Sequence, residues 1–204
     1  MQDQGLYMVV SAPSGAGKTT ICKKILKMFP NIKYSVSYTT RPARSGEVDG
    51  RDYHFVSEED FRERIANGGF AEWSENFGYL YGTSLDTLKE NLHRGFDLML
   101  DVETQGARAI KQHYPGGAFI FIMPPSMEEL KKRLIGRGFE DRENLLRRIN
   151  EARDMIKEYD WYDYVIFNDS LKNAVDCFRS IYLAEKSRRS RWESRVKRFL
   201  DTSS

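Results

Sequence analysis

The feature that most constrains this chain is a glycine-rich segment near its N-terminus, residues 9–20, with the sequence Val-Val-Ser-Ala-Pro-Ser-Gly-Ala-Gly-Lys-Thr-Thr. The apolar run Leu6–Val10 precedes it, and apolar side chains at helical spacing follow it, at positions 21, 25, 26 and 29. A strand, a glycine-rich turn and a helix in this order are the context of a phosphate-binding loop, whose backbone amides face phosphate oxygens at a helix N-terminus. This order predicts an α/β fold with a polyphosphate site.

Individual residues of the segment suit that chemistry. Gly15 and Gly17 permit backbone conformations that a side chain would block, Lys18 supplies a charge for the β- and γ-phosphates, and Thr19 offers a hydroxyl to Mg²⁺. Ala12 departs from the pattern G-x-x-x-x-G-K-[ST], which has glycine at that position. The alternative is a glycine-rich turn that only connects the strand to the helix.

Composition narrows the class of protein. A chain of 204 residues fits one domain, and 32 Lys and Arg against 30 Asp and Glu argue against nucleic acid as a partner. The two cysteines, Cys22 and Cys177, fit no metal-ligand spacing and are predicted to be buried in a reducing compartment. No apolar run approaches the ~20 residues of a membrane span, and no basic region precedes the N-terminal apolar stretch. We expect a cytoplasmic protein without a membrane partner.

Short apolar runs alternate with helical stretches along the chain. The predicted buried strands are Leu6–Val10, Phe96–Leu100, Ala118–Met123 and Tyr164–Phe167. This alternation is typical of a parallel sheet covered by helices on both faces, with ligands at the carboxyl ends of the strands. Because Asp101 and Asn168 follow strand ends, we expect them to converge with the phosphate loop on one crevice.

Two regions interrupt the alternation. Residues 36–92 contain two strand-like segments, Asp52–Val56 and Phe70–Phe77. Between them a capping box at Ser57 marks the start of a helix. This region is therefore predicted to be an inserted, partly β subdomain. Residues 126–160 are charged and helical, with a capping box at Ser126 and a Gly-Arg-Gly interruption at 136–138, which suits a mobile lid. An ordinary helical hairpin with a solvated face is the alternative to the lid.

The C-terminal part, Leu171 to Leu200, is predicted to form one or two helices. Its basic run, residues 186–191, is interpreted as a solvated face, with phosphate or RNA binding as the less favoured alternative.

A second basic segment lies at residues 35–55. A turn containing proline is expected to bring Arg41 and Arg44 together beside hydroxyl side chains. Two guanidinium groups with hydroxyls form a site for a doubly charged phosphate, and Tyr53 could add a phenolic donor to it. The alternative is a surface loop whose arginines pair with the acidic residues at positions 47, 49 and 52.

These segments together resemble the guanylate kinase family. The resemblance runs from about residue 6 to residue 185 and includes Ser-Ala-Pro-Ser-Gly-Ala-Gly-Lys-Thr, Val-Ser-Tyr-Thr-Thr-Arg-Pro-Ala-Arg-x-Gly-Glu, Tyr-Leu-Tyr-Gly-Thr, Leu-Asp-Val-Glu-Thr-Gln-Gly, Pro-Pro-Ser, Gly-Arg-Gly and Val-Ile-Phe-Asn-Asp. In this family alanine is common at the position of Ala12.

The resemblance implies one domain with a parallel-sheet core that contains the phosphate loop (residues 1–35, 93–125 and 161–204), a mixed α/β subdomain for GMP (about 36–92) and a helical lid (about 126–160). It implies transfer of the γ-phosphoryl group of MgATP to GMP, and to dGMP as well, giving ADP and the nucleoside diphosphate in purine metabolism. The partners are these small molecules, and the oligomeric state, monomer or homodimer, stays open.

The resemblance also assigns site residues. ATP would contact Ala12, Pro13, Ser14, Gly15, Ala16, Gly17, Lys18, Thr19, Thr20 and Asn168, the last at the adenine. GMP would contact Ser37, Arg41, Arg44, Tyr53 and Tyr81 through its phosphate, and Glu72, Thr83 and Asp101 through its base. Mg²⁺ would bind Thr19 directly, and Asp101 either directly or through water. The catalytic cations would be Lys18, Arg41, Arg44, Arg133, Arg137 and Arg148.

Physical chemistry supports Glu72 as the residue that recognises guanine. The Watson–Crick edge of guanine carries adjacent N1–H and N2–H donors, and one carboxylate accepts both, whereas adenine would present a lone pair at N1. A surface glutamate is the alternative for Glu72. The role of Asp101 stays open between the metal and guanine. Glu103 stands where many relatives have aspartate, and its side chain is one methylene longer.

The transfer itself needs positioned cations. Arg133 and Arg137 are four residues apart and would share a helix face if the helix persists that far. No general base is required, because the acceptor is already an oxyanion, and none of the three histidines, His54, His93 and His113, is assigned a catalytic role. Closure of subdomain and lid over the phosphate loop would exclude water.

There are three alternatives to the function of a guanylate kinase. A different P-loop kinase of small phosphorylated metabolites is disfavoured by Glu72 and Thr83, which suit a purine. A scaffold module without catalysis is disfavoured because Gly17, Lys18 and Thr19 are all present. A P-loop GTPase is disfavoured because the chain lacks an Asn-Lys-x-Asp motif.

Overall fold

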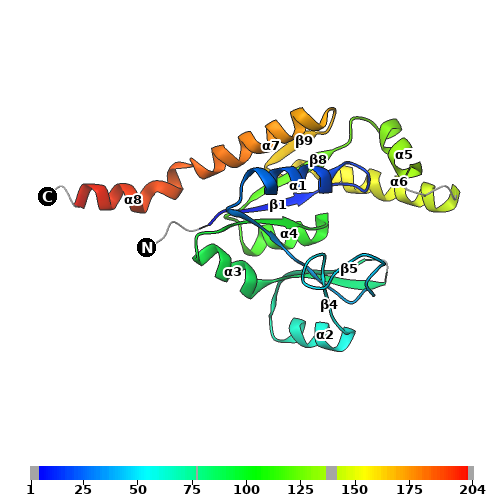
Figure 1. Cartoon of the computed structure of the whole chain (residues 1–204), viewed down its shortest axis with the longest axis horizontal. Coiled ribbons are helices and arrows are strands. Elements are labelled where there is room, and N and C mark those ends of the chain that lie inside the picture. The colour runs from blue at the N-terminus through cyan, green and yellow to red at the C-terminus, as the bar shows by residue number, and fades with distance from the viewer. Residues whose placement is uncertain (1–4, 77, 137–141, 202–204) are drawn as a thin grey trace.

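The computed structural model describes residues 5–76, 78–136 and 142–201. Its main feature is a parallel sheet in the order β2-β7-β1-β8-β9 (Figure 1). The strands are β1 (Tyr7–Ser11), β2 (Ile32–Ser35), β7 (Asp97–Asp101), β8 (Ala118–Met123) and β9 (Tyr164–Phe167). The four predicted strands are present, two of them shifted by one residue. The short edge strand β2 was not predicted because its sequence, Ile-Lys-Tyr-Ser, has no apolar run.

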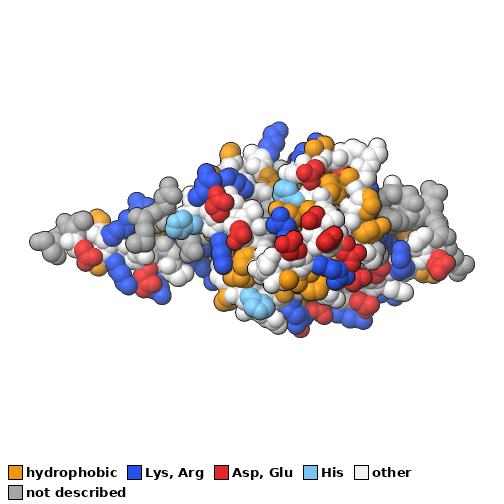
Figure 2. All heavy atoms as spheres, turned by 90° about the horizontal axis from the view of Figure 1, so that it is seen from below, with side chains coloured by type: hydrophobic (Ala, Val, Ile, Leu, Met, Phe, Trp, Pro, Cys, Tyr) orange, Lys and Arg blue, Asp and Glu red, His pale blue; other side chains and the backbone are white. Residues whose placement is uncertain are grey.

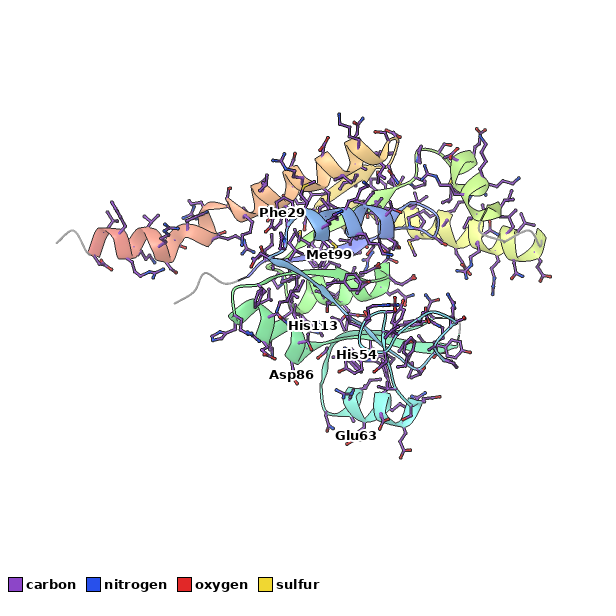
Figure 3. The ribbon with its side chains drawn as sticks, in the orientation of Figure 1. Phe29, His54, Glu63, Asp86, Met99 and His113 are labelled. Atoms are coloured by element: carbon purple, nitrogen blue, oxygen red, sulfur yellow. The ribbon has the colours of Figure 1, made fainter. Side chains whose placement is uncertain are left out.

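Alternate residues of β1 point to opposite faces of the sheet, and each face is covered by helices. Met8 and Val10 pack with α1 (Lys18–Met28) and α7 (Leu171–Lys186), in a core that also includes Met99, with Phe29 packed against it (Figure 3). Tyr7 and Val9 pack with α3 (Leu85–His93) and α4 (Thr104–His113) on the other face. The sheet is therefore buried on both sides, and its free carboxyl edge is left for ligands.

A smaller mixed sheet, in the order β4-β3-β6-β5, lies below the large one in Figure 1. Its strands are β3 (Tyr38–Thr39), β4 (His54–Phe55), β5 (Phe70–Asn76) and β6 (Tyr79–Ser84). Helix α2 (Glu58–Ala66) packs on it through Phe61, whose ring stacks on Phe70 at 4.4 Å between centroids. The Ser57 hydroxyl accepts a hydrogen bond from the Asp60 amide, which confirms the predicted helix start.

The charged region after β8 forms two helices, α5 (Met127–Ile135) and α6 (Arg142–Lys157), followed by the 3₁₀ helix η1 (Glu158–Trp161). The helices hold together through Leu130, Leu134 and Ala152, which are buried against one another. The predicted cap is present, since the Ser126 hydroxyl accepts from the Glu129 amide at 3.1 Å. Helix α5 ends at Ile135, and the predicted lid arginine Arg137 lies outside the described residues.

The C-terminal part forms two helices, as predicted: α7 and α8 (Arg189–Asp201), the second of which projects from the body of the molecule (Figure 1). Its basic run is not only a solvated face. Lys186 pairs at 3.0 Å with Asp97, which is fully buried, and Arg188 pairs with Glu185 at 2.7 Å. A buried carboxylate needs such a partner, so Lys186 helps to fix α7 against the sheet. The prediction for Cys177 was wrong: it is exposed, whereas Cys22 is buried.

The surface carries both signs of charge. On the face shown in Figure 2, basic and acidic side chains are interspersed, in keeping with a net charge of +2. Among the described residues, no helix combines the length and apolarity needed to cross a membrane.

Candidate active site

The phosphate loop connects β1 to α1. Gly15 and Gly17 have φ of +91° and +98°, in the left-handed region that favours glycine, and Gly17 precedes the first residue of α1. Ala12 is 7% exposed and belongs to the apolar core beside α1, so a methyl group is accommodated at that position. The loop has the conformation that its glycines predict, with a helix N-terminus directly behind it.

Asn168 lies against this loop. Its amide Nδ2 donates a hydrogen bond of 2.7 Å to the Ala16 carbonyl, and a Cβ on Gly17 would collide with the same amide. The guanidinium of Arg133, from α5, is also close to Gly17, because its Nη1 would lie 4.0 Å from such a Cβ. Asn168 and Arg133 thus converge on the loop from separate parts of the chain.

Lys18 forms an ion pair with Asp101, the last residue of β7. Burial acts to lower the pKa of Lys18, but the adjacent Asp101 carboxylate outweighs it, and the pKa is raised overall. The expected convergence of the loop, Asp101 and Asn168 is therefore confirmed. Thr19, the candidate metal ligand, is exposed one residue further along α1.

A second cluster surrounds Arg41 in the smaller sheet. Its guanidinium carbon lies 5.4 Å from the centre of the Tyr53 ring and 5.8 Å from that of Phe55. The Tyr53 and Tyr81 rings are 6.0 Å apart, centre to centre. Three of the residues predicted to bind the acceptor phosphate, Arg41, Tyr53 and Tyr81, therefore lie together.

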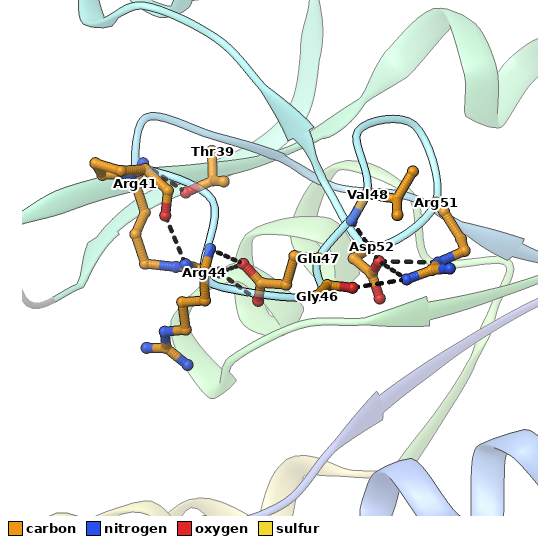
Figure 4. Close-up of polar contacts among 9 residues, drawn as sticks. Thr39, Arg41, Arg44, Gly46, Glu47, Val48, Arg51 and Asp52 are labelled. Carbon is orange, nitrogen blue, oxygen red and sulfur yellow. Dashed lines mark hydrogen bonds and ion pairs between the residues drawn. The ribbon is translucent and has the colours of Figure 1, made fainter.

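The other two predicted phosphate ligands, Arg44 and Ser37, form no side-chain hydrogen bond with the Arg41 cluster in the described part of the chain. Arg44 is exposed, and its side chain extends away from Glu47 (Figure 4). Ser37 is half-buried, and its carbonyl accepts from the His54 amide at 2.9 Å. The predicted alternative, in which arginines of this loop pair with acidic residues, holds for Arg41, which binds Glu47.

Glu72 is buried, so the alternative of a surface glutamate is wrong. It is 7% exposed and accepts a 2.6 Å hydrogen bond from the Thr83 hydroxyl on the neighbouring strand. Helix α4 covers it at Gly106, where a Cβ would collide with the Glu72 carboxylate. Burial raises the pKa of Glu72 to about 7, against the opposing effect of the Thr83 hydrogen bonds.

Tyr34 is a residue of the site that sequence reasoning missed. It is paired with Met99 in the register of β2 and β7, so Asp101, two residues on, projects from the same face of the sheet. Tyr34 is 39% exposed as a residue, but desolvation of its phenol and then the Asp101 carboxylate raise its pKa, and the same two causes raise the pKa of Tyr53. The charge of Asp101, which pairs with Lys18 behind the phosphate loop, therefore acts on Tyr53 in the Arg41 cluster.

A cavity of about 800 Å³ lies beside the phosphate loop, between α4 and α6. Pro13 and Ser14 of the loop, Glu103 at the start of α4, and Arg148 of α6 are among the residues that line it. Arg148 pairs with Glu151 at 3.5 Å. Of the three predicted lid arginines, Arg133 therefore lies next to the loop, Arg148 borders this cavity, and Arg137 lies outside the described residues.

The histidines occupy other environments. The His54 ring stacks on Tyr38 at 4.6 Å, and Nδ1 of His113 lies 2.9 Å from the Ala109 carbonyl at the end of α4 (Figure 3). His93 is exposed in the last turn of α3.

Comparison with known proteins decides the family. Residues 4–185 match the family model described as guanylate kinase. The chain is 50% identical over 201 residues to the guanylate kinase of Syntrophotalea carbinolica, covering 98% of this chain and 96% of the relative. The chain belongs to the guanylate kinase family. The guanylate kinase of Geobacter metallireducens is also 50% identical, over 92% of this chain and 93% of its own.

A solved structure agrees with this assignment. The crystal structure of guanylate kinase from Anaplasma phagocytophilum has a TM-score of 0.78, at 36% identity over 93% of this chain and 90% of its own. The predicted family and the predicted α/β fold are confirmed. Guanylate kinases are nucleotide kinases that phosphorylate GMP with ATP, so the reading as a kinase of other phosphorylated metabolites is not supported.

Proposed function

We propose that this chain transfers the γ-phosphoryl group of Mg-bound ATP to GMP, and to dGMP, releasing ADP and the nucleoside diphosphate. The observation that supports it most directly is that the chain carries two anion-binding clusters, one around Lys18 and the other around Arg41, and that the charge of Asp101, the partner of Lys18, acts on Tyr53 in the second cluster. Phosphoryl transfer requires a donor and an acceptor phosphate in line, and the protein contributes mainly position and positive charge.

The donor phosphates would occupy the phosphate loop. Backbone N–H groups of the loop, apart from Pro13, which has none, would surround them at the N-terminus of α1, and Lys18 would exchange part of its contact with Asp101 for the β- and γ-phosphates. The Asp101 carboxylate keeps the ammonium charged and oriented before ATP arrives. Asn168 already holds the loop at Ala16, and its carbonyl oxygen is the group that we assign to the adenine.

Two oxygen ligands fit a magnesium ion that arrives with ATP. The Thr19 hydroxyl is exposed at the start of α1, and the Asp101 carboxylate lies beside Lys18. Mg²⁺ prefers oxygen ligands and keeps several waters, so two protein groups suffice when phosphates complete the shell. A bound Mg²⁺ would neutralise charge on the transferring phosphate.

The acceptor would bind in the smaller sheet. Its phosphate would meet Ser37, Arg41, Arg44, Tyr53 and Tyr81, and its base would reach Glu72 and Thr83. A buried carboxylate in this position accepts both guanine donors and would be left unpaired by adenine, so selectivity arises from hydrogen bonding rather than size.

Transfer would be completed by cations from the lid. Arg133 is next to Gly17, and Arg148 borders the cavity at Pro13 and Ser14, so both can move towards an ATP phosphate on closure. An arginine that contacts the transferring group contributes on the order of 10³-fold or more in related reactions. Arg137 is proposed for the same role.

A single assay tests the proposal. ADP release is measured with ATP and Mg²⁺ in the presence of GMP, dGMP, AMP or UMP. We expect turnover with GMP and dGMP and background rates with AMP and UMP. Equal rates with AMP and GMP would contradict the role of Glu72, and no GMP-dependent ADP release would contradict the proposed function.

A further inference from the structure

The carboxylate of Glu47 joins the two arginines of the acceptor loop, which runs from β3 to β4. Its two oxygens lie 2.8 and 2.9 Å from Nη2 of Arg41, and Oε2 also accepts a 2.7 Å hydrogen bond from the backbone amide of Arg44 (Figure 4). The Glu47 amide in turn donates to the Arg44 carbonyl at 3.0 Å. One side chain therefore contacts the guanidinium of the first arginine and the backbone of the second.

These contacts determine how Arg41 is held. Arg41 is 7% exposed, although it carries a full charge, and its Nη1 donates to the Pro42 carbonyl at 2.8 Å. A buried cation requires a compensating anion, and the hydrogen-bonded Glu47 carboxylate raises the pKa of Arg41 while its own pKa is lowered. The guanidinium is thus fixed between one carboxylate, one carbonyl and the rings of Tyr53 and Phe55.

We infer that Glu47 is a positioning residue for the acceptor phosphate, which orients Arg41 through its guanidinium and Arg44 through its backbone amide before GMP binds. The inference rests on the proposed acceptor site. Preorganisation of this kind reduces the cost of ordering the site on binding.

The same loop contains a matched control. Asp52 accepts a 2.8 Å hydrogen bond from the Val48 amide and pairs with Arg51 at 2.7 Å, so it also ties the loop together (Figure 4). The Arg51 side chain is 64% exposed, and neither Asp52 nor Arg51 belongs to the proposed phosphate site. Removal of the Asp52 charge therefore perturbs the loop to a similar extent but leaves the contacts of Arg41 and Arg44 in place.

The test compares Glu47→Gln with Asp52→Asn. A glutamine side chain offers one oxygen acceptor and an amide donor, so it cannot make all three contacts of Glu47. For Glu47→Gln we expect the KM for GMP to rise by about 10-fold or more, with the KM for ATP within about twofold of wild type, because charge-assisted hydrogen bonds to Arg41 are lost. For Asp52→Asn both KM values should stay within about twofold of wild type, as for a surface ion pair.

Binding measurements separate positioning from a general loss of structure. Calorimetric titration with GMP and with guanosine, which has no phosphate, should show weaker binding of GMP to Glu47→Gln and unchanged binding of guanosine. Equal weakening of both ligands, or a wild-type KM for GMP, would overturn the inference. If Glu47→Gln does not fold, Glu47→Asp decides: its shorter side chain should also raise the KM for GMP selectively, and an unchanged value would overturn the inference. Wild-type turnover with GMP tests the proposed function separately.

Discussion

At the scale of single residues, Lys18 is the cation that the proposed donor site depends on. Its side chain is 19% exposed and paired with Asp101, so its replacement by an uncharged side chain of similar length removes charge without filling new space. Lys18→Met should lower kcat by about 10²–10³-fold, comparable with loss of a group that stabilises transition-state charge.

The measurement is steady-state ADP release with circular dichroism as a check of folding. Lys24→Met is the matched control, because Lys24 lies on the same helix and is exposed. Wild-type turnover of Lys18→Met would remove Lys18 from the mechanism.

Glu72 should determine which base is accepted. In Glu72→Gln the amide accepts one guanine donor well and opposes the other, so the KM for GMP should rise about 10–100-fold. The preference for GMP over AMP should shrink by a similar factor. Glu75→Gln, an exposed position on the same strand, serves as the control. Unchanged GMP kinetics in Glu72→Gln would exclude Glu72 from the base site.

The same carboxylate predicts a pH dependence. Its pKa is raised to about 7, so below that pH the free protein holds a neutral Glu72, which cannot accept both guanine donors. Binding through the ionised form requires loss of that proton, so the KM for GMP should rise about tenfold per unit as the pH falls below 7, and level off above it. The profile is measured between pH 5.5 and 8.5. A flat KM in wild type, or the same slope in Glu72→Gln, would contradict the prediction.

At the scale of elements, the close contact between α4 and β5 is what buries Glu72. Gly106 lacks a side chain where the Glu72 carboxylate approaches, and a Cβ there would collide with it. Gly106→Ala favours helix formation intrinsically by about 1 kcal/mol, but it should displace Glu72 and raise the KM for GMP. Gly116→Ala is the control, because a Cβ at Gly116 meets nothing within 4 Å.

The two readouts for Gly106→Ala are the KM for GMP and the Tm. We expect a higher KM for GMP with the KM for ATP unchanged. A wild-type KM for GMP together with a raised Tm would show that α4 can move away from Glu72 without consequence for the site.

At the scale of the whole molecule, the smaller sheet and the α5–α6 pair extend from the large sheet on either side of the phosphate loop (Figure 1). Water at the transferring phosphate would hydrolyse ATP, so we expect both parts to close when both substrates are bound. Small-angle X-ray scattering should show a smaller radius of gyration with GMP and a non-hydrolysable ATP analogue together than with neither. Identical values in both states would contradict closure.

The sequence by itself determined the family, the parallel sheet and the phosphate loop. These depend on local patterns: apolar runs long enough to be buried on both faces, and glycines whose positive φ no other residue adopts readily. The capping boxes at Ser57 and Ser126 were predictable for the same reason, because each is a contact between residues three apart. The assignment of site residues and subdomain boundaries stays a prediction that came from the resemblance.

Only the tertiary structure decided which side chains are buried and which charged groups form ion pairs. Glu72 is buried because α4 packs over a strand distant in sequence, and Tyr34 reaches the site because an edge strand aligns it with Asp101. The exposure of Cys177 and the pairing of Lys186 with Asp97 were likewise missed. Burial and ion pairing depend on neighbours brought together by the fold, and a local pattern does not contain them.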